Sequence, residues 1–253
     1  MTLATRAVLT AALAAVVAVA AYAGPGQSGT QGTSVPLVVV SALLAVAVAV
    51  GWPELANLPD RKGSATVVAL TGIGGVAAVH SIGARADLRS LAVVFAASML
   101  LTFVNEMLRR DGRPRLVESV AGTVTGSMLA VTAAGWVACG RLLDGKELAA
   151  AAAVALALAA SVSAVRLPVW LTALAVTAVG GVGGTALGIA LHQVGPKVGG
   201  FAGLAVGLLV AAMHALFHPM AALDRKLPAV SAAVIPVATG GMLVYVASRV
   251  LLA

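Results

Sequence analysis

The strongest structural signal in the chain is the stretch at residues 168–217, PVWLTALAVTAVGGVGGTALGIALHQVGPKVGGFAGLAVGLLVAAMHALF. It holds two apolar runs, separated by a short polar segment that contains Pro196. Each run has the length, about twenty residues, that a helix needs to cross the hydrocarbon core of a bilayer. The stretch therefore predicts two consecutive membrane-spanning helices.

Both runs carry glycine at every fourth position, and a shorter pair opens an earlier apolar run. Glycines spaced in this way line one face of a helix and let two backbones approach closely, which favours association of helices in lipid. We expect close packing within the molecule, with a dimer seam as the alternative. The paired glycines at 180–181 and 183–184 also favour a local break in that helix. The packing residues are Gly122, Gly126, Gly180, Gly184, Gly188, Gly199, Gly203 and Gly207.

The composition extends this prediction to the whole chain. Hydrophobic residues make up 60%, charged residues only 10%, and the mean hydropathy is +1.04, whereas about a quarter of the residues in soluble domains are charged. We predict an all-α, polytopic transmembrane bundle that forms one integral membrane domain over residues 1–253. About nine helices are expected, at 3–23, 35–50, 65–83, 90–108, 118–140, 148–165, 168–192, 199–217 and 229–252. The first also resembles a signal peptide ending at Ala21-Tyr22-Ala23, whose cleavage would leave eight.

The distribution of Lys and Arg predicts the orientation. With the N-terminus in the cytoplasm, the inside segments hold more of these residues than the outside segments, as positive-inside topology requires. Abundant Ala, Gly and Arg are typical of a high-GC bacterial gene, so we predict the bacterial inner membrane. Few aromatic residues and no basic stripe argue against nucleic-acid binding. Trp52, Trp136 and Trp170 fall near predicted span ends, where interfacial aromatic residues are expected.

The densest group of charges is NEMLRRDGRPRLVES, residues 105–119. It falls between two predicted spans, so we expect a cytoplasmic loop that fixes orientation and touches anionic lipid headgroups. Because Arg forms bidentate contacts with phosphate, specific binding of an anionic lipid or a phosphorylated substrate is the alternative. The binding candidates are Arg109, Arg110, Arg113 and Arg115, together with Arg225 in a later loop.

A second polar segment, HALFHPMAALDRK, covers residues 214–226. His214 and His218 are four residues apart and share a helix face, and Asp224 follows. These three residues are the catalytic candidates, since two His and one Asp could bind a divalent metal, although the spacing matches no established ligand motif. The competing interpretation is an interfacial helix end with charges that fix topology. No acidic residue lies at the middle of a predicted span, which argues against an ion-coupled transporter.

Two segments resemble one enzyme family. RPRLVESVAG at 113–122 and the run from His218 to Arg225 resemble, respectively, a span-opening segment and the C-terminal signature of CDP-diacylglycerol synthases, the phosphatidate cytidylyltransferases. The resemblance implies a cytoplasmic, metal-dependent site for CTP and phosphatidic acid. Pro219 and Met220 replace the two glycines of the signature, so the resemblance implies a degenerate metal site.

The leading hypothesis is a non-enzymatic multi-pass membrane component that binds lipid or a partner, or a small permease-like unit. Its expected partners are membrane phospholipids, with a homo-oligomer or a membrane-protein partner left open, and no cofactor is expected. The alternative is a lipid-headgroup enzyme at the cytoplasmic face that uses His214, His218 and Asp224, with Mg²⁺ needed only in that case.

Overall fold

The computed structural model describes residues 1–23, 34–81, 89–142, 145–165, 167–217 and 220–251. Within these ranges the chain is all-helical, and nine helices are long and apolar enough to cross a membrane. This confirms the predicted fold class. The helices are α1 (Leu3–Tyr22), α2 (Val35–Leu55), α3 (Arg61–Ser81), α4 (Arg89–Leu108), α5 (Leu116–Val131), α6 (Ala134–Gly140), α7 (Gly145–Val162), α8 (Val169–Ala190), α9 (Pro196–Phe217), the 3₁₀ turn η1 (Ala221–Asp224) and α10 (Lys226–Leu251).

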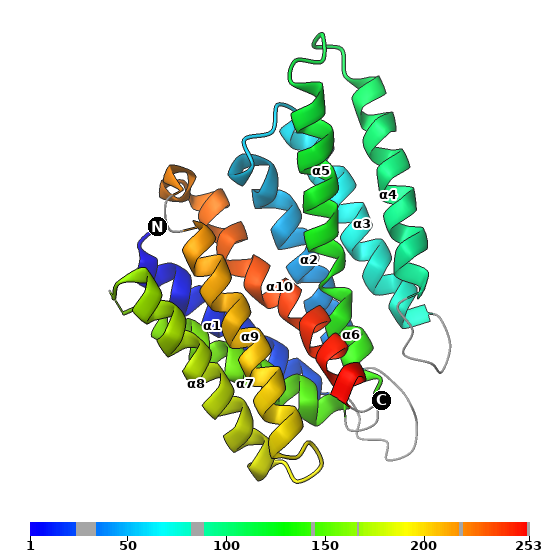
Figure 1. Cartoon of the computed structure of the whole chain (residues 1–253). Helices are drawn as coiled ribbons and strands as arrows, with labels where there is room; N and C mark the ends of the chain where they lie inside the picture. The colour runs from blue at the N-terminus through cyan, green and yellow to red at the C-terminus, as the bar shows by residue number, and fades with distance from the viewer. Residues whose placement is uncertain (24–33, 82–88, 143–144, 166, 218–219, 252–253) are drawn as a thin grey trace.

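Successive spans run in opposite directions, so the connections alternate between the two ends of the bundle (Figure 1). At the end that holds the N-terminus, the Met1 amine donates to the carbonyl of Leu223 at 3.3 Å, and Arg115 donates to the carbonyl of Asn57 at 3.2 Å. At the opposite end, Arg141 donates to the carbonyl of His80 at 3.0 Å. We call these the N-terminal end and the C-terminal end of the bundle.

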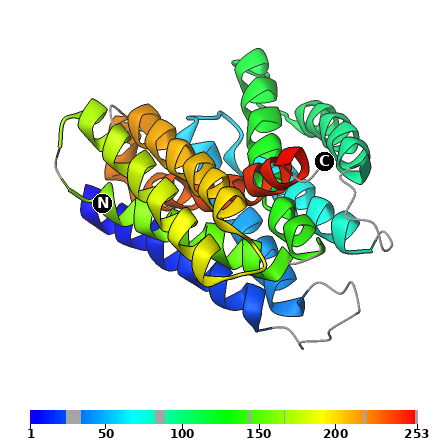
Figure 2. The ribbon, with the colours of Figure 1, turned by 60° about the horizontal axis from the view of Figure 1, so that its bottom comes forward.

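The spans differ in how much of their surface the protein covers. α10 is the most buried span, with 78% of its apolar stretch inside the protein, and α4 is the least buried, with 22%. Figure 2 shows α8 and α9 side by side on one flank, with α4 on the far side of the bundle. α4 packs against α3 and α5 and exposes Met107 and Leu108, as a lipid-facing helix should.

The glycines of α8 and α9 bring these two helices into backbone contact. A Cβ atom added at Gly180 would lie 2.6 Å from the carbonyl oxygen of Gly203, and one at Gly207 would lie 3.0 Å from Cα of Thr177. Cβ atoms at Gly184 and Gly199 would each meet the carbonyl oxygen of the other residue. The two rows therefore interlock along one seam.

The glycines of α5 have a different role. Cβ atoms at Gly122 and Gly126 would meet the side chains of Leu58 and Trp52 rather than another backbone. The indole of Trp52 donates to the carbonyl of Gly122 at 2.8 Å. These glycines accommodate bulky side chains from α2 and from the connection that follows it.

The break predicted in the glycine-rich seventh span is wrong, because α8 is continuous from Val169 to Ala190. The described break lies instead in the fifth span, at Thr132 and Ala133, where bonds from residue i to i−3 replace the α-helical pattern. It separates α6 from α5 and sets Trp136 against α10. A Cβ atom at Gly241 would lie 2.6 Å from the Trp136 ring.

Trp136 was also expected at the membrane interface, and its position is different. The side chain is fully buried, and the indole donates to the carbonyl of Val237 at 2.7 Å. A large apolar ring with one polar group suits such a core position when that group has a partner. Trp170, by contrast, is exposed near the start of α8.

Candidate functional site

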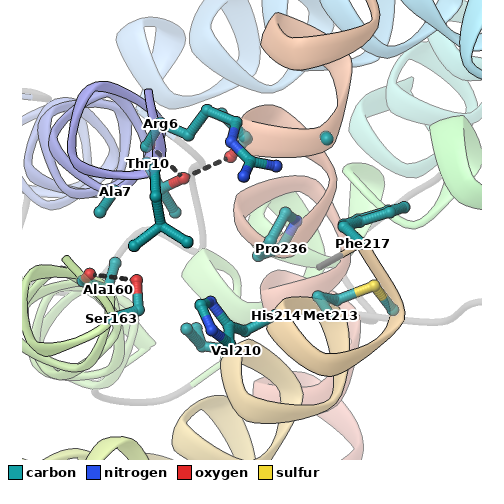
Figure 3. A pocket seen from close by; sticks show the side chains of 13 residues that line it. Arg6, Ala7, Thr10, Ala160, Ser163, Val210, Met213, His214, Phe217 and Pro236 are labelled. Carbon is teal, nitrogen blue, oxygen red and sulfur yellow. Dashed lines mark hydrogen bonds between the residues drawn. The ribbon is translucent and has the colours of Figure 1, made fainter. Parts of the chain in front are cut away.

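A small pocket at the N-terminal end is lined by His214, which lies in the last turn of α9. Its volume is about 60 Å³, and it lies between α1, α7, α9 and α10 (Figure 3). Arg6, Thr10, Ser163 and His214 supply its polar groups, and the remaining lining is apolar. In Figure 3 the Arg6 side chain and the His214 ring lie on opposite sides of this space.

The hydroxyl groups of this pocket are bonded to backbone carbonyls. Thr10 Oγ1 contacts the carbonyl oxygens of Arg6, at 3.0 Å, and Ala233, at 2.9 Å, and the latter contact ties α1 to α10. Ser163 Oγ donates to the carbonyl of Ala160 at 2.6 Å. Nε of Arg6 is buried and has no hydrogen-bond partner among the described residues. A guanidinium and an imidazole therefore line the same small space.

The three catalytic candidates are only partly brought together. Asp224 is exposed in η1, close enough to Arg6 for their charges to interact, but it does not line the pocket of His214. His218 lies outside the described residues. No group of three His, Cys, Asp or Glu side chains that could hold a metal ion occurs in the described part of the chain. A metal site that includes His218 stays a prediction.

The charged segment between α4 and α5 is organised by Glu106, a buried residue in the last turn of α4. Glu106 Oε2 accepts from Arg109 Nη1 at 2.7 Å, and Oε1 accepts from the hydroxyl of Ser119 on α5. Arg109 also donates to Asp111 at 2.7 Å, and its side chain is only 5% exposed. Arg109 is thus held inside the protein and braces the α4–α5 hairpin.

The ion pair with Arg109 also affects the titration of Asp111. The hydrogen bond from the Arg109 guanidinium, with a smaller contribution from the backbone N–H of Arg113, lowers the pKa of the Asp111 carboxyl below its usual value of 3.8. Asp111 therefore stays charged at neutral pH, and the segment keeps both partners of this ion pair.

The other arginines of the segment lie at the surface. Arg113 donates to the carbonyl of Met107 at 3.1 Å, and Arg115 pairs with Glu118. Both arginines have left-handed backbone conformations, with φ of 53° and 55°, which non-glycine residues adopt at some cost. Arg110 is exposed and forms no ion pair among the described residues. Arg225 is likewise exposed without one.

A second pocket opens beside this segment, with a volume of about 330 Å³. We call it the α3–α4 pocket, because it lies between the start of α3 and the end of α4. Asp60 accepts from the Asn105 amide at 3.0 Å and from the backbone N–H of Gly63 at 3.1 Å, which caps α3. The pocket is lined by Pro59, Asp60, Asn105, Leu108, Arg109, Arg110 and Asp111.

Sequence reasoning did not identify Asp60, Asn105, Glu106 or Ser119 as members of a site. One signal was present: Ser98, Thr102 and Glu106 are spaced by four residues, which places them on one face of α4, and all three are buried. The spacing of Ser119, Thr123 and Ser127 on α5 gives the same signal, and these residues are buried too.

Comparison with known proteins finds no match for this chain among family models, curated proteins or solved structures. The resemblance to CDP-diacylglycerol synthases therefore rests on the two segments quoted above. The finding that the chain is a multi-pass membrane protein rests on the nine candidate spans among the described residues.

Proposed function

We propose that this protein is a non-enzymatic membrane component that binds anionic phospholipid headgroups through the N-terminal end of its bundle. The observation that supports this is a set of exposed cations at that end without ion-pair partners among the described residues. Four acidic side chains at this end, Glu54, Glu106, Asp111 and Glu118, pair with Arg61, Arg109 or Arg115, whereas Asp60 and Asp224 form no ion pair with a described residue. The exposed cations left over at this end are Lys62, Arg110, Arg113, Arg225 and Lys226.

These five residues lie where helices begin or end or in the connection between α4 and α5, which is the level of lipid headgroups for a membrane-spanning bundle. Lys62 is in the first turn of α3, Arg110 follows α4, and Arg225 and Lys226 join η1 to α10. A Lys or Arg near an anionic membrane surface contributes roughly 1 kcal/mol of attraction. Together they favour a surface that binds anionic lipid, and an inside location of this end fits the positive-inside rule.

The experiment measures the melting temperature of the detergent-purified protein during titration with phosphatidylglycerol or phosphatidylcholine. We expect phosphatidylglycerol to raise the melting temperature by several degrees, with a smaller effect of phosphatidylcholine. The double variant Arg225→Gln/Lys226→Gln should lose most of that rise. Its matched control is Lys197→Gln, which removes an exposed cation at the C-terminal end and should leave the rise unchanged.

Two results would overturn the proposal. One is equal stabilisation by the two lipids in the wild-type protein, which would remove the role of charge. The other is stabilisation by CTP with Mg²⁺ that disappears in Asp224→Ala, because that result would indicate an enzyme with a nucleotide site at η1.

A further inference from the structure

The α3–α4 pocket contains two unpaired charges of opposite sign. Asp60 accepts hydrogen bonds only from neutral donors, the Asn105 amide and the Gly63 N–H, and no described cation forms an ion pair with it. Arg110 lines the same pocket, and none of its donors is engaged by a described residue. A ligand that carries one positive and one negative group would match this arrangement.

Asp60 and Arg110 can both form further hydrogen bonds to such a ligand. An ionised carboxylate has about four acceptor positions, and Asp60 uses two of them. Next to it, Arg109 is almost fully buried, yet its Nε–H has no acceptor among the described residues. Because this Nε is buried, the phosphate of a ligand would reach Arg110, which is exposed, rather than Arg109.

The surroundings of the pocket indicate what the rest of the ligand is. Leu108 lines the pocket and is 74% exposed, and Met107 beside it is 72% exposed. These side chains belong to the lipid-facing surface of α4 at the end of the span. A ligand in the pocket can therefore continue into the bilayer along α4. The volume of about 330 Å³ lies within the range of small-molecule sites.

We propose that the α3–α4 pocket binds the headgroup of an aminophospholipid. The primary ammonium of the headgroup contacts Asp60, the phosphate contacts Arg110, and the acyl chains lie along α4. The inference rests on the proposed function only in placing the N-terminal end at the level of the headgroups. It does not require Arg225 or Lys226.

The sharpest test compares phosphatidylethanolamine with phosphatidylcholine carrying the same acyl chains, since the two differ only in three N-methyl groups. The methylated ammonium has no N–H to donate to Asp60. Native mass spectrometry should show that the wild-type protein binds phosphatidylethanolamine at least tenfold more tightly than phosphatidylcholine. Phosphatidylethanolamine should also raise the melting temperature more than phosphatidylcholine does. A third titration uses soluble phosphoethanolamine, which carries the same charges without acyl chains.

Two variants separate the roles of the two charges. Asp60→Asn keeps an N-cap for α3 but removes the negative charge, so the preference for phosphatidylethanolamine over phosphatidylcholine should fall to near one. Arg110→Gln should weaken both lipids equally, because both carry the phosphate. Because Arg110 is exposed and unpaired among the described residues, this variant should fold normally even if Asp60→Asn does not. Glu54→Gln removes a nearby acid outside the pocket and should keep the preference.

Equal binding of the two lipids by the wild-type protein overturns the inference, as does an unchanged preference in Asp60→Asn. If phosphatidylglycerol stabilises through Arg225 and Lys226 while no preference for phosphatidylethanolamine exists, only this inference fails. A preference for phosphatidylethanolamine without any effect of phosphatidylglycerol overturns the proposed function instead. If soluble phosphoethanolamine binds as tightly as the lipid, the roles of Asp60 and Arg110 are supported, but the ligand is a soluble molecule rather than a lipid.

Discussion

Glu106 is the residue whose removal should cost the α4–α5 hairpin most. It is 4% exposed and joins Arg109 to Ser119 across two helices. Loss of one partner of a buried ion pair typically costs about 3–5 kcal/mol. Because Arg109 keeps Asp111, we expect Glu106→Ala to lower the free energy of unfolding by about 3 kcal/mol, the lower end of that range. Reversible unfolding by titration with a denaturing detergent measures it.

Asp111→Asn provides the control, since Asp111 binds the same guanidinium from an exposed position. Exposed ion pairs contribute little to stability, so this variant should change the unfolding free energy far less than Glu106→Ala. Its effect should depend on pH. The folded pKa of Asp111 is lowered, so its contribution is complete above the unfolded value of 3.8 and is lost as the pH falls through the folded pKa. Equal losses in the two variants would contradict the bracing role of Glu106.

The same residues show what sequence reasoning could and could not predict at this scale. The concentration of arginines between two spans was visible in the sequence. The burial of Arg109 was not, because it depends on Glu106 being turned toward Ser119, which lies on the next helix thirteen residues away. Only when α4 packs against α5 can the Glu106 carboxylate accept from the Ser119 hydroxyl and the Arg109 guanidinium at the same time. Arg110, one residue further along, stays exposed.

Among the helices, the seam between α8 and α9 gives the clearest prediction. Replacing glycine by alanine inside a helix normally favours the helix by about 1 kcal/mol. At Gly184 the added Cβ would meet the carbonyl oxygen of Gly199, and at Gly203 it would lie 2.9 Å from Cα of Gly184. Because backbone atoms cannot move aside cheaply, Gly184→Ala and Gly203→Ala should each lower the melting temperature in detergent by several degrees.

Gly183→Ala is the matched control for this seam, because it makes the same change of propensity in the same helix. Its Cβ would contact only the end of the Leu158 side chain, at 3.0 Å, and that flexible side chain can adjust. We expect an unchanged or slightly higher melting temperature. A loss as large as that of Gly184→Ala would mean that glycine flexibility, rather than close packing, is required in α8.

Helix positions were predictable because hydrophobic length and glycine spacing are local properties of the sequence. The break at Thr132 and Ala133 was not, because its cause is distant. Trp136 bonds to Val237, 101 residues away, and its ring lies against Gly241. A buried indole needs both a partner for its N–H and room for its ring, and α10 supplies both. The paired glycines at 180–181 and 183–184 favoured a break in α8 by composition alone. The packing of α8 against α9 instead supports a continuous helix.

At the scale of the whole molecule, the nine spans in the described part of the chain alternate in direction, which places the N-terminus and the charged hairpin at one end and the start of α9 at the other (Figure 1). The structure fixes which segments share a side, and the distribution of Lys and Arg predicts that the N-terminal end is cytoplasmic. The sole cysteine, Cys139, is fully buried. Single cysteines introduced at exposed positions can therefore be labelled in intact cells with little background from the native residue.

We expect Lys197→Cys, at the C-terminal end, to react with a membrane-impermeant maleimide in intact cells. Arg110→Cys, at the N-terminal end, should react only after the membrane is permeabilised. Both side chains are exposed, so the two sites differ mainly in the side of the membrane on which they lie. The reverse labelling pattern would mean that the protein has the opposite orientation, with the cations of the N-terminal end on the outside of the cell. Lipid binding by Arg225 and Lys226 would then take place in the outer leaflet, so this labelling decides which leaflet should supply the lipid in the binding experiments.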